Sequence, residues 1–287
     1  MNTMSERTRG ILLVTAAAIF WSFGGLLIKL VELHPMATAG SRSLIAAATI
    51  WVLARPFSAR FTSGQLMGAL AYAGTVTFFV LATRTTTAAN AILLQYTAPI
   101  YAALLSYRML GERITRIDWF SIVLVLAGMA LFFFDGLASG GSLGDLYAVI
   151  SGVFFALCVV LLRRERHGSP FSIVLLGNLI TALIGLPFLT VQPPSTNDLL
   201  LLIPLGVLQL GLGYIFFVRG VRYVSAIEGT LIPVIEPLLN PIWVALFHGE
   251  QPTMLALIGG GIVVGAVTAR GIYKASYERA TPQGSPS

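Results

Sequence analysis

Glu236 is the residue of this chain whose type and position are most suited to chemistry. It lies near the middle of an apolar run, 225–250, that is long enough to cross a membrane and contains Pro233, Pro237 and Pro241. A carboxylate at that depth can take up a proton, meet a substrate ammonium, or bond backbone amides freed by a kink. Each proline removes a backbone donor and bends a helix. Together these residues indicate a span used for passage or gating.

The same stretch has a counterpart earlier in the chain. When the sequence is shifted by 138 positions without a gap, nine of the thirty-five positions from 78 to 112 are identical, including Arg84, Pro99 and the pair Gly111-Glu112. In a mostly apolar chain, matches of arginine, proline and a Gly-Glu pair are less expected by chance than matches of apolar residues. We therefore expect a tandem repeat, with a first unit at 1–138 and a second at 139–287. The repeat partner of Glu236 is Ala98, so the carboxylate does not belong to the shared scaffold.

Composition defines the class of protein. The 287 residues are 56% hydrophobic and only 10% charged, with a mean hydropathy of +0.84, whereas soluble domains carry about 25% charged residues. This composition predicts a polytopic membrane protein. The single cysteine, Cys158, excludes a disulfide framework and a thiolate metal site. The net charge of +6 comes mostly from Lys and Arg at the ends of apolar runs, which set topology, so nucleic acid is not an expected partner.

A helix of about twenty apolar residues crosses a bilayer. By this length criterion, we expect ten spans in the chain. The first apolar run imitates a signal peptide, but it continues to Leu30 without a clear small-residue cleavage site, so we expect a retained span. The ten spans are expected at roughly 11–30, 37–54, 65–83, 87–107, 118–134, 145–162, 171–190, 199–218, 225–247 and 254–272.

The positive charges predict the orientation of these spans. Fifteen Lys and Arg residues fall on the side of the N-terminus, against three on the other side, Lys29, Arg42 and Arg84. Both termini are therefore expected in the cytoplasm. Five spans per repeat is an odd number, so the second repeat must be inverted. Inverted repeats with helices interrupted at corresponding positions, here Pro99 and Pro237 as expected hinges, point to a secondary transporter whose substrate site lies at the repeat interface.

The two span endings APIYAALLSYRMLGE and EPLLNPIWVALFHGE, within ten spans and a five-plus-five repeat, resemble the drug/metabolite transporter superfamily in its EamA-type branch. The resemblance covers nearly the whole chain, from about Gly10 to Ile272. It implies an all-α polytopic membrane protein with ten transmembrane helices, arranged as two inverted five-helix repeats around a central cavity. It also implies export of amino acids or other metabolites by alternating access across the cell inner membrane. The many aromatic residues are similar to those of the YddG-type aromatic amino-acid exporters.

Aromatic side chains within the spans predict the class of substrate. Tyr and Trp in an apolar region need a partner for their polar atom, and a wet cavity that accepts flat, partly apolar solutes provides one. The residues are Trp21, Tyr72, Tyr96, Tyr101, Tyr214 and Trp243. A few polar groups are expected to fix the orientation of the substrate, namely Ser22, Thr75, Asn90, Gln95 and Asn240, together with Glu236.

Other polar residues have two interpretations each. Glu228 and its repeat partner Asn90 lie one turn inside their spans, where they can favour a helix N-terminus or form a gate contact. Arg42 can extend to the membrane interface or guide a substrate carboxylate. Glu112, in a Gly-Glu pair that matches the family motif, is expected to anchor a loop, as is Glu250. The pairs Gly64/Gly68 and Gly261/Gly265 suit close helix packing within one chain or in a homodimer.

The alternatives to an amino-acid exporter differ in the groups that they require. A membrane enzyme needs a metal or an acid/base cluster, yet the three histidines are far apart, and no catalytic residue, metal site or cofactor is expected. The central spans of the second repeat lack a deep Lys or Arg, which argues against a phosphorylated substrate. A proton-coupled exporter of drugs or other cations remains the alternative, because Glu236 can neutralise a cation.

Overall fold

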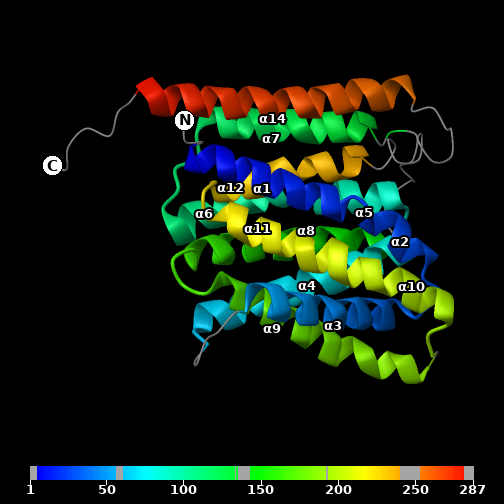
Figure 1. Cartoon of the computed structure of the whole chain (residues 1–287). Coiled ribbons are helices and arrows are strands. Elements are labelled where there is room, and N and C mark those ends of the chain that lie inside the picture. Colours follow the sequence, from blue (N-terminus) through cyan, green and yellow to red (C-terminus); the bar gives the residue numbers. More distant parts are fainter. Residues whose placement is uncertain are drawn as a thin grey trace.

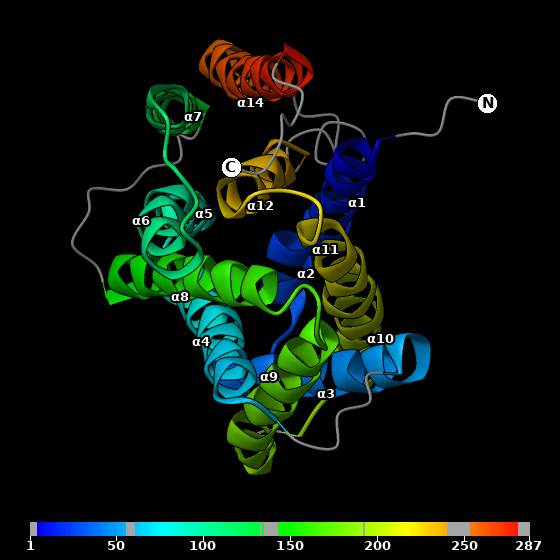
Figure 2. The ribbon, with the colours of Figure 1, turned by 90° about the vertical axis from the view of Figure 1, so that its left-hand side faces the viewer.

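The computed structural model describes residues 5–55, 61–132, 134, 143–191, 193–239 and 253–280. Every regular element in these residues is a helix, and they contain no strand. The helices run roughly along one axis as a single bundle (Figure 1), which Figure 2 shows after a quarter turn. The start of α1 and the end of α14 lie at the same end of the bundle, which we call the α1 end.

The helices of the first half are α1 (Glu6–Trp21), α2 (Gly24–Leu30), α3 (Pro35–Ala54), α4 (Ser63–Thr85), α5 (Ala88–Gln95), α6 (Ala98–Leu110) and α7 (Arg116–Phe132). Those of the second half are α8 (Leu143–Arg164), α9 (Pro170–Gly185), α10 (Thr196–Pro204), α11 (Gly213–Val221), α12 (Ala226–Leu231) and α14 (Met254–Ala280). A π-helical segment, Leu205–Leu212, joins α10 to α11, and 3₁₀ turns follow α9 and α12 at Leu186–Thr190 and Ile232–Val234.

Six helical stretches of the described chain are long and apolar enough to cross a membrane by length and composition. They are Pro35–Ala54, Ser63–Thr85, Leu143–Arg164, Pro170–Thr190, Thr196–Val221 and Met254–Lys274. Each coincides with one of the expected spans. The four other expected spans, 11–30, 87–107, 118–134 and 225–247, fall on shorter helices or extend beyond the described ranges.

The expected span 11–30 is not one helix. It is interrupted after Trp21, and α2 starts at Gly24. At this break the hydroxyl of Ser22 donates to the carbonyl of Ile19 at 2.7 Å. A Cβ on Gly24 would lie 2.8 Å from Nε2 of Gln209, so the close approach of this break to the π-helical segment depends on a glycine. Hydropathy alone gave no sign of this interruption, although Ser22, Gly24 and Gly25 lie at it and such residues often accompany helix kinks.

The expected fourth and ninth spans begin and break at corresponding positions. Thr87 caps α5 and Ser225 caps α12 through the same side-chain bond to a backbone N–H three residues later, and the two caps are 138 positions apart. The fourth span breaks between α5 and α6, where Pro99 lies in the first turn of α6, a position in which its missing N–H costs nothing. The ninth breaks at the 3₁₀ turn that contains Pro233. Pro237 is buried in the helical residues that follow.

The helices pack in pairs, of which α4 with α8, α3 with α9 and α7 with α14 are the most extensive. Figure 2 shows α7 and α14 as a separate layer at one edge of the bundle. The closest approach within this layer is between Gly128 and Gly259, where a Cβ on either glycine would meet the backbone oxygen of the other. Gly261 and Gly265 have no other residue's atoms within 4 Å of an added Cβ, so they do not pack this layer.

A network of buried charges joins four helices at the α1 end. Asp118 of α7 is fully buried and accepts bonds from Nη2 and Nε of Arg270 at 2.6 and 2.9 Å, with Nζ of Lys274 at 3.6 Å. Arg270, on α14, also lies 3.4 Å from Glu228 of α12, which pairs with Arg7 of α1 at 2.6 Å. The edge layer of α7 and α14 is therefore attached to the rest of the bundle by ion pairs as well as by apolar contacts.

We predict that Asp118→Ala strongly destabilises the protein, because it leaves the guanidinium of Arg270 buried with one acidic partner fewer. Breaking a buried pair costs about 3–5 kcal/mol, so the thermal unfolding transition in detergent should fall by many degrees. The control is Glu6→Ala, which removes an exposed carboxylate from α1 and should change the free energy of unfolding by no more than about 0.5 kcal/mol. Equal transitions for the two variants would contradict this account.

Candidate substrate-binding site

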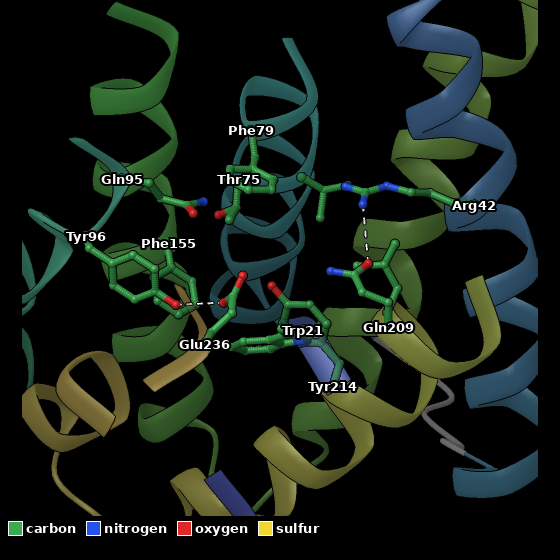
Figure 3. Close-up of a pocket in the computed structure, with 12 residues that line it drawn as sticks. Trp21, Arg42, Thr75, Phe79, Gln95, Tyr96, Phe155, Gln209, Tyr214 and Glu236 are labelled. Carbon is green, nitrogen blue, oxygen red and sulfur yellow. Dashed lines mark hydrogen bonds between the residues drawn. The ribbon is translucent and has the colours of Figure 1, made fainter. Parts of the chain in front are cut away.

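A pocket lies inside the bundle where residues of both halves of the chain meet (Figure 3). The empty space between its lining atoms, including the part open to solvent, is about 450 Å³. Its lining combines aromatic rings, amides, one arginine and one carboxyl group. The residues are Trp21, Arg42, Thr75, Val76, Phe79, Gln95, Tyr96, Phe155, Gln209, Leu210, Tyr214 and Glu236.

The two broken spans meet at this pocket through Tyr96 and Glu236. The hydroxyl oxygen of Tyr96 lies 2.6 Å from Oε2 of Glu236 and 2.8 Å from the carbonyl oxygen of Pro233. A tyrosine has one hydroxyl proton, so it can donate to only one of these acceptors at a time. Both contacts are hydrogen bonds only when Glu236 is protonated and donates to Tyr96, which then donates to Pro233. In that state, the two hydrogen bonds connect a proton on Glu236 to the break in the ninth span.

Arg42 enters the pocket from α3 and is only 1% exposed. Its Nη1 donates to Oε1 of Gln209 at 3.3 Å, and its Nε is buried without a hydrogen-bond partner. Its side chain is buried in the pocket and does not reach the surface of the bundle, which argues against the alternative that it extends to the membrane interface. Gln209 comes from the π-helical segment, a kind of irregularity that is frequent at functional sites.

Aromatic rings form one wall of the pocket. The ring of Trp21 lies 4.8 Å from that of Tyr214 and 6.0 Å from that of Phe155. Tyr72 packs behind this wall, with its ring 4.6 Å from the ring of Tyr214. The indole N–H of Trp21 is buried without a hydrogen-bond partner in the described structure. Buried polar groups are normally bonded; a Cβ on Gly213 would lie 2.5 Å from Nε1 of Trp21, so this N–H lies against α11.

The opposite wall is fixed by hydrogen bonds between helices. Nε2 of Gln95 donates to the hydroxyl of Ser151 at 2.8 Å, and that hydroxyl donates to the carbonyl of Thr75 at 2.9 Å. This series of two hydrogen bonds joins α5, α8 and α4. A Cβ on Gly152 would collide with the carbonyl of Gln95 at 2.6 Å, so α8 passes close to the end of α5. The end of α5 is thus held in place beside the break that follows it in the sequence.

The structure brings together six of the predicted substrate-binding residues: Trp21, Thr75, Gln95, Tyr96, Tyr214 and Glu236 line the pocket. Four others do not line it. Ser22 bonds within its own helix, Tyr72 packs behind the aromatic wall, and Tyr101 is half-buried among apolar neighbours. Asn90 lies at the end of the bundle opposite the α1 end. Asn240 and Trp243 lie outside the described residues.

Several residues that line the pocket were not among the predicted substrate-binding residues. Arg42 and Gln209 are polar side chains within apolar runs, and that contrast was a usable signal. Phe79 and Phe155, by comparison, cannot be told from packing residues among the 17 phenylalanines of the chain.

Two polar contacts that the repeat relates to one another lie at opposite ends of the bundle. At the α1 end, Arg7 pairs with Glu228 at 2.6 Å. At the opposite end, Nδ2 of Asn90 donates to Oδ1 of Asp145 at 3.0 Å. A shift of 138 positions converts Arg7 into Asp145 and Asn90 into Glu228. Glu228 also accepts the backbone N–H of Ser225 at 2.9 Å, so it serves both the helix N-terminus and the contact with α1.

Glu112, of the first Gly-Glu pair, connects the end of the fourth span to its neighbours. Its Oε1 accepts from Nε of Arg163 at 2.7 Å, and its Oε2 accepts from the backbone N–H of Ala226 at 3.1 Å. The same arginine donates to the carbonyls of Val221 and Arg222. Glu112 therefore fixes the loop that leads into α12.

Comparisons with known proteins identify several transporters as similar to this chain. An uncharacterized transporter of Archaeoglobus fulgidus is 29% identical over 67% of this chain and 70% of its own length. The pseudopaline exporter CntI of Pseudomonas aeruginosa is 29% identical over 63% of this chain and 65% of its own length, slightly under two thirds. The threonine/homoserine exporter RhtA of Escherichia coli is 29% identical over 74% of this chain and 73% of its own length.

Similarity in structure and in family signature extends over more of the chain. A protein crystal structure that covers 92% of this chain matches it with a TM-score of 0.78 at 20% sequence identity, and 98% of that structure is covered, so the two share a fold. The EamA-like transporter family matches twice, at residues 8–134 and 142–269. The chain is therefore a multi-pass membrane protein of the EamA-like transporter family, a branch of the drug/metabolite transporters.

Proposed function

We propose that the protein is a secondary transporter of the cell inner membrane that exports amino acids, aromatic and other apolar ones most readily, and related metabolites. The observation that carries this proposal is the pocket at which two broken helices from the two halves of the chain meet, lined by aromatic rings and the carboxyl group of Glu236. In this proposal ten helices cross the membrane as two inverted repeats, and both termini are cytoplasmic. The export of pseudopaline by one relative, and of threonine and homoserine by another, supports it.

The pocket suits an amino acid better than the alternatives. The aromatic wall of Trp21, Tyr214 and Phe155 fits a flat or apolar side chain, while Glu236 can accept an ammonium group. This is also the support for the narrower resemblance to YddG-type exporters. A phosphorylated solute would bring its charge close to Glu236. The family and the relatives are named as transporters, which supports a transporter over an enzyme.

A proton-coupled exporter of cationic drugs is the second candidate. The geometry of Tyr96 and Glu236 supports it, because the carboxyl group can carry a proton in one state and neutralise a cation in the other. The guanidinium of Arg42 in the same pocket weighs against it, because it repels a solute that carries only positive charge.

Alternating access in this proposal uses the repeat-related contacts at the two ends of the bundle. The contact of Arg7 with Glu228 joins α1 to α12, and its counterpart, Asn90 with Asp145, joins α5 to α8. Both are formed in this structure. We propose that each opens in turn as the pocket is exposed to one side of the membrane and then to the other, with the breaks near Pro99 and Pro237 as hinges.

Uptake into proteoliposomes tests the proposed function. Labelled tryptophan and threonine should enter vesicles that contain the protein faster than empty vesicles, with or without a pH gradient. Glu236→Gln should lower amino-acid uptake by about ten-fold or more, because it removes a charged partner of the ammonium group. Glu6→Gln is the matched control, since this carboxylate is exposed on α1 and far from the pocket residues. Amino-acid uptake no faster than in empty vesicles would overturn the proposal.

A quaternary-ammonium dye separates the two candidates in the same vesicles. The proposal predicts little dye uptake. Dye uptake that needs the pH gradient and is lost in Glu236→Gln would instead identify a proton-coupled cation exporter.

Cross-linking tests the paired contacts. Cysteines placed at 7 and 228, or at 90 and 145, should each stop transport when joined by a short cleavable thiol reagent, and cleavage should restore it. The native Cys158 is buried and the four single-cysteine variants are the controls, which should keep transporting after the same treatment. Undiminished transport with either pair fully cross-linked would show that the contact at that end does not open during the cycle.

A further inference from the structure

Arg42 is a buried cation without an acidic partner in the part of the chain that the structure describes. Its one hydrogen bond goes to Gln209, a neutral amide, at 3.3 Å, and its Nε has no hydrogen-bond partner. The other buried arginine, Arg270, differs in each respect, because it is paired with Asp118 and lies close to Glu228. Buried charges are normally paired. The guanidinium of Arg42 therefore lacks the anion that such a site requires.

The pocket offers that anion a place. Figure 3 shows Arg42 reaching in from α3 on the side opposite Tyr96 and Gln95, while Glu236 lies beside Tyr96 with the rings of Trp21 and Tyr214 next to it. A guanidinium binds a carboxylate through two parallel N–H donors, and here Gln209 uses Nη1, which leaves other donors of the group available. Cation and carboxyl group thus lie on different sides of one aromatic-lined space.

We propose that Arg42 binds the carboxylate of the substrate, so that the pocket takes a zwitterion with its carboxylate on Arg42 and its ammonium group on Glu236. This inference rests on the proposed function and narrows it: both charges on the substrate are required. An amine without a carboxylate leaves Arg42 unpaired, and an acid without an amine adds a second negative charge near Glu236. Gln209 is the positioning residue, because its amide oxygen holds the guanidinium toward the pocket.

Three compounds that share one ring system test the wild-type protein directly. They are tryptophan, tryptamine, which lacks the carboxylate, and indole-3-propionate, which lacks the ammonium group. Inhibition of labelled tryptophan uptake in proteoliposomes measures the affinity of each. We expect each analogue to bind about ten-fold or more weakly than tryptophan, since each leaves one buried charge without its partner.

Variants then assign the two charges. Arg42→Gln should weaken tryptophan to the level of tryptamine while leaving tryptamine unchanged or better bound. Glu236→Gln should weaken tryptophan toward indole-3-propionate and spare that acid. Arg42→Lys keeps the cation and should retain part of the preference for tryptophan over tryptamine. Arg55→Gln is the control, because Arg55 is an exposed arginine just past the other end of the same helix. Thermal unfolding of each variant shows whether it is folded.

The outcomes separate this inference from the proposed function. Wild-type transport of tryptophan with equal inhibition by tryptamine would overturn the role of Arg42 and leave an amino-acid transporter in place. An unchanged preference for tryptophan over tryptamine in folded Arg42→Gln would do the same. Failure of the wild type to transport any amino acid would overturn both.

Discussion

A charged side chain buried at membrane depth has to be paired or to line a cavity, and this requirement shapes the centre of the bundle. Arg42 and Glu236 both lie inside a chain with only 10% charged residues, and neither has an oppositely charged partner among the described residues. Glu236 is held by a tyrosine and Arg42 by an amide. The fold keeps both groups away from lipid, and in the proposed function a solute completes the site.

The repeat supplies a symmetric scaffold around an asymmetric pocket. Corresponding caps at Thr87 and Ser225 start the fourth and ninth spans, and both spans break near the pocket. The polar lining has no such symmetry. The positions that correspond to Arg42, Gln209 and Glu236 are occupied by Ile180, Ala71 and Ala98. The two halves therefore provide similarly broken helices, while each half contributes different polar groups to the pocket. In the proposed function, a solute with two unlike ends binds in one orientation.

The class of fold and part of the site could be predicted from the sequence. Hydropathy and run length predicted the six membrane-length helices that the structure describes. The paired prolines predicted that the fourth and ninth spans are broken, although the ninth breaks at Pro233 and not at Pro237. These signals act locally along the chain. The break after Trp21 and the π-helical segment around Gln209 escaped prediction, since both depend on helices that approach closely at Gly24 and Gly206. Such contacts are set by tertiary packing and leave no period in the sequence.

The depth of Arg42 illustrates the same limit. Its place one turn into an apolar run allowed either a position near the interface or a role toward a substrate carboxylate. The helix starts at Pro35, only two residues before the expected start, and Arg42 lines the pocket because α3 packs against the π-helical segment that carries Gln209. Phe155 became a lining residue only through the packing of α8 beside the two broken spans.

An experimental structure with a bound amino acid tests the central claim most directly. Crystals or cryo-EM particles of the protein with saturating tryptophan should show density for the solute between Arg42 and Glu236, with its carboxylate within hydrogen-bond distance of the guanidinium and its ring against Trp21 and Tyr214. Density for tryptophan elsewhere in the bundle, or in this pocket with its carboxylate turned away from Arg42, would contradict the account.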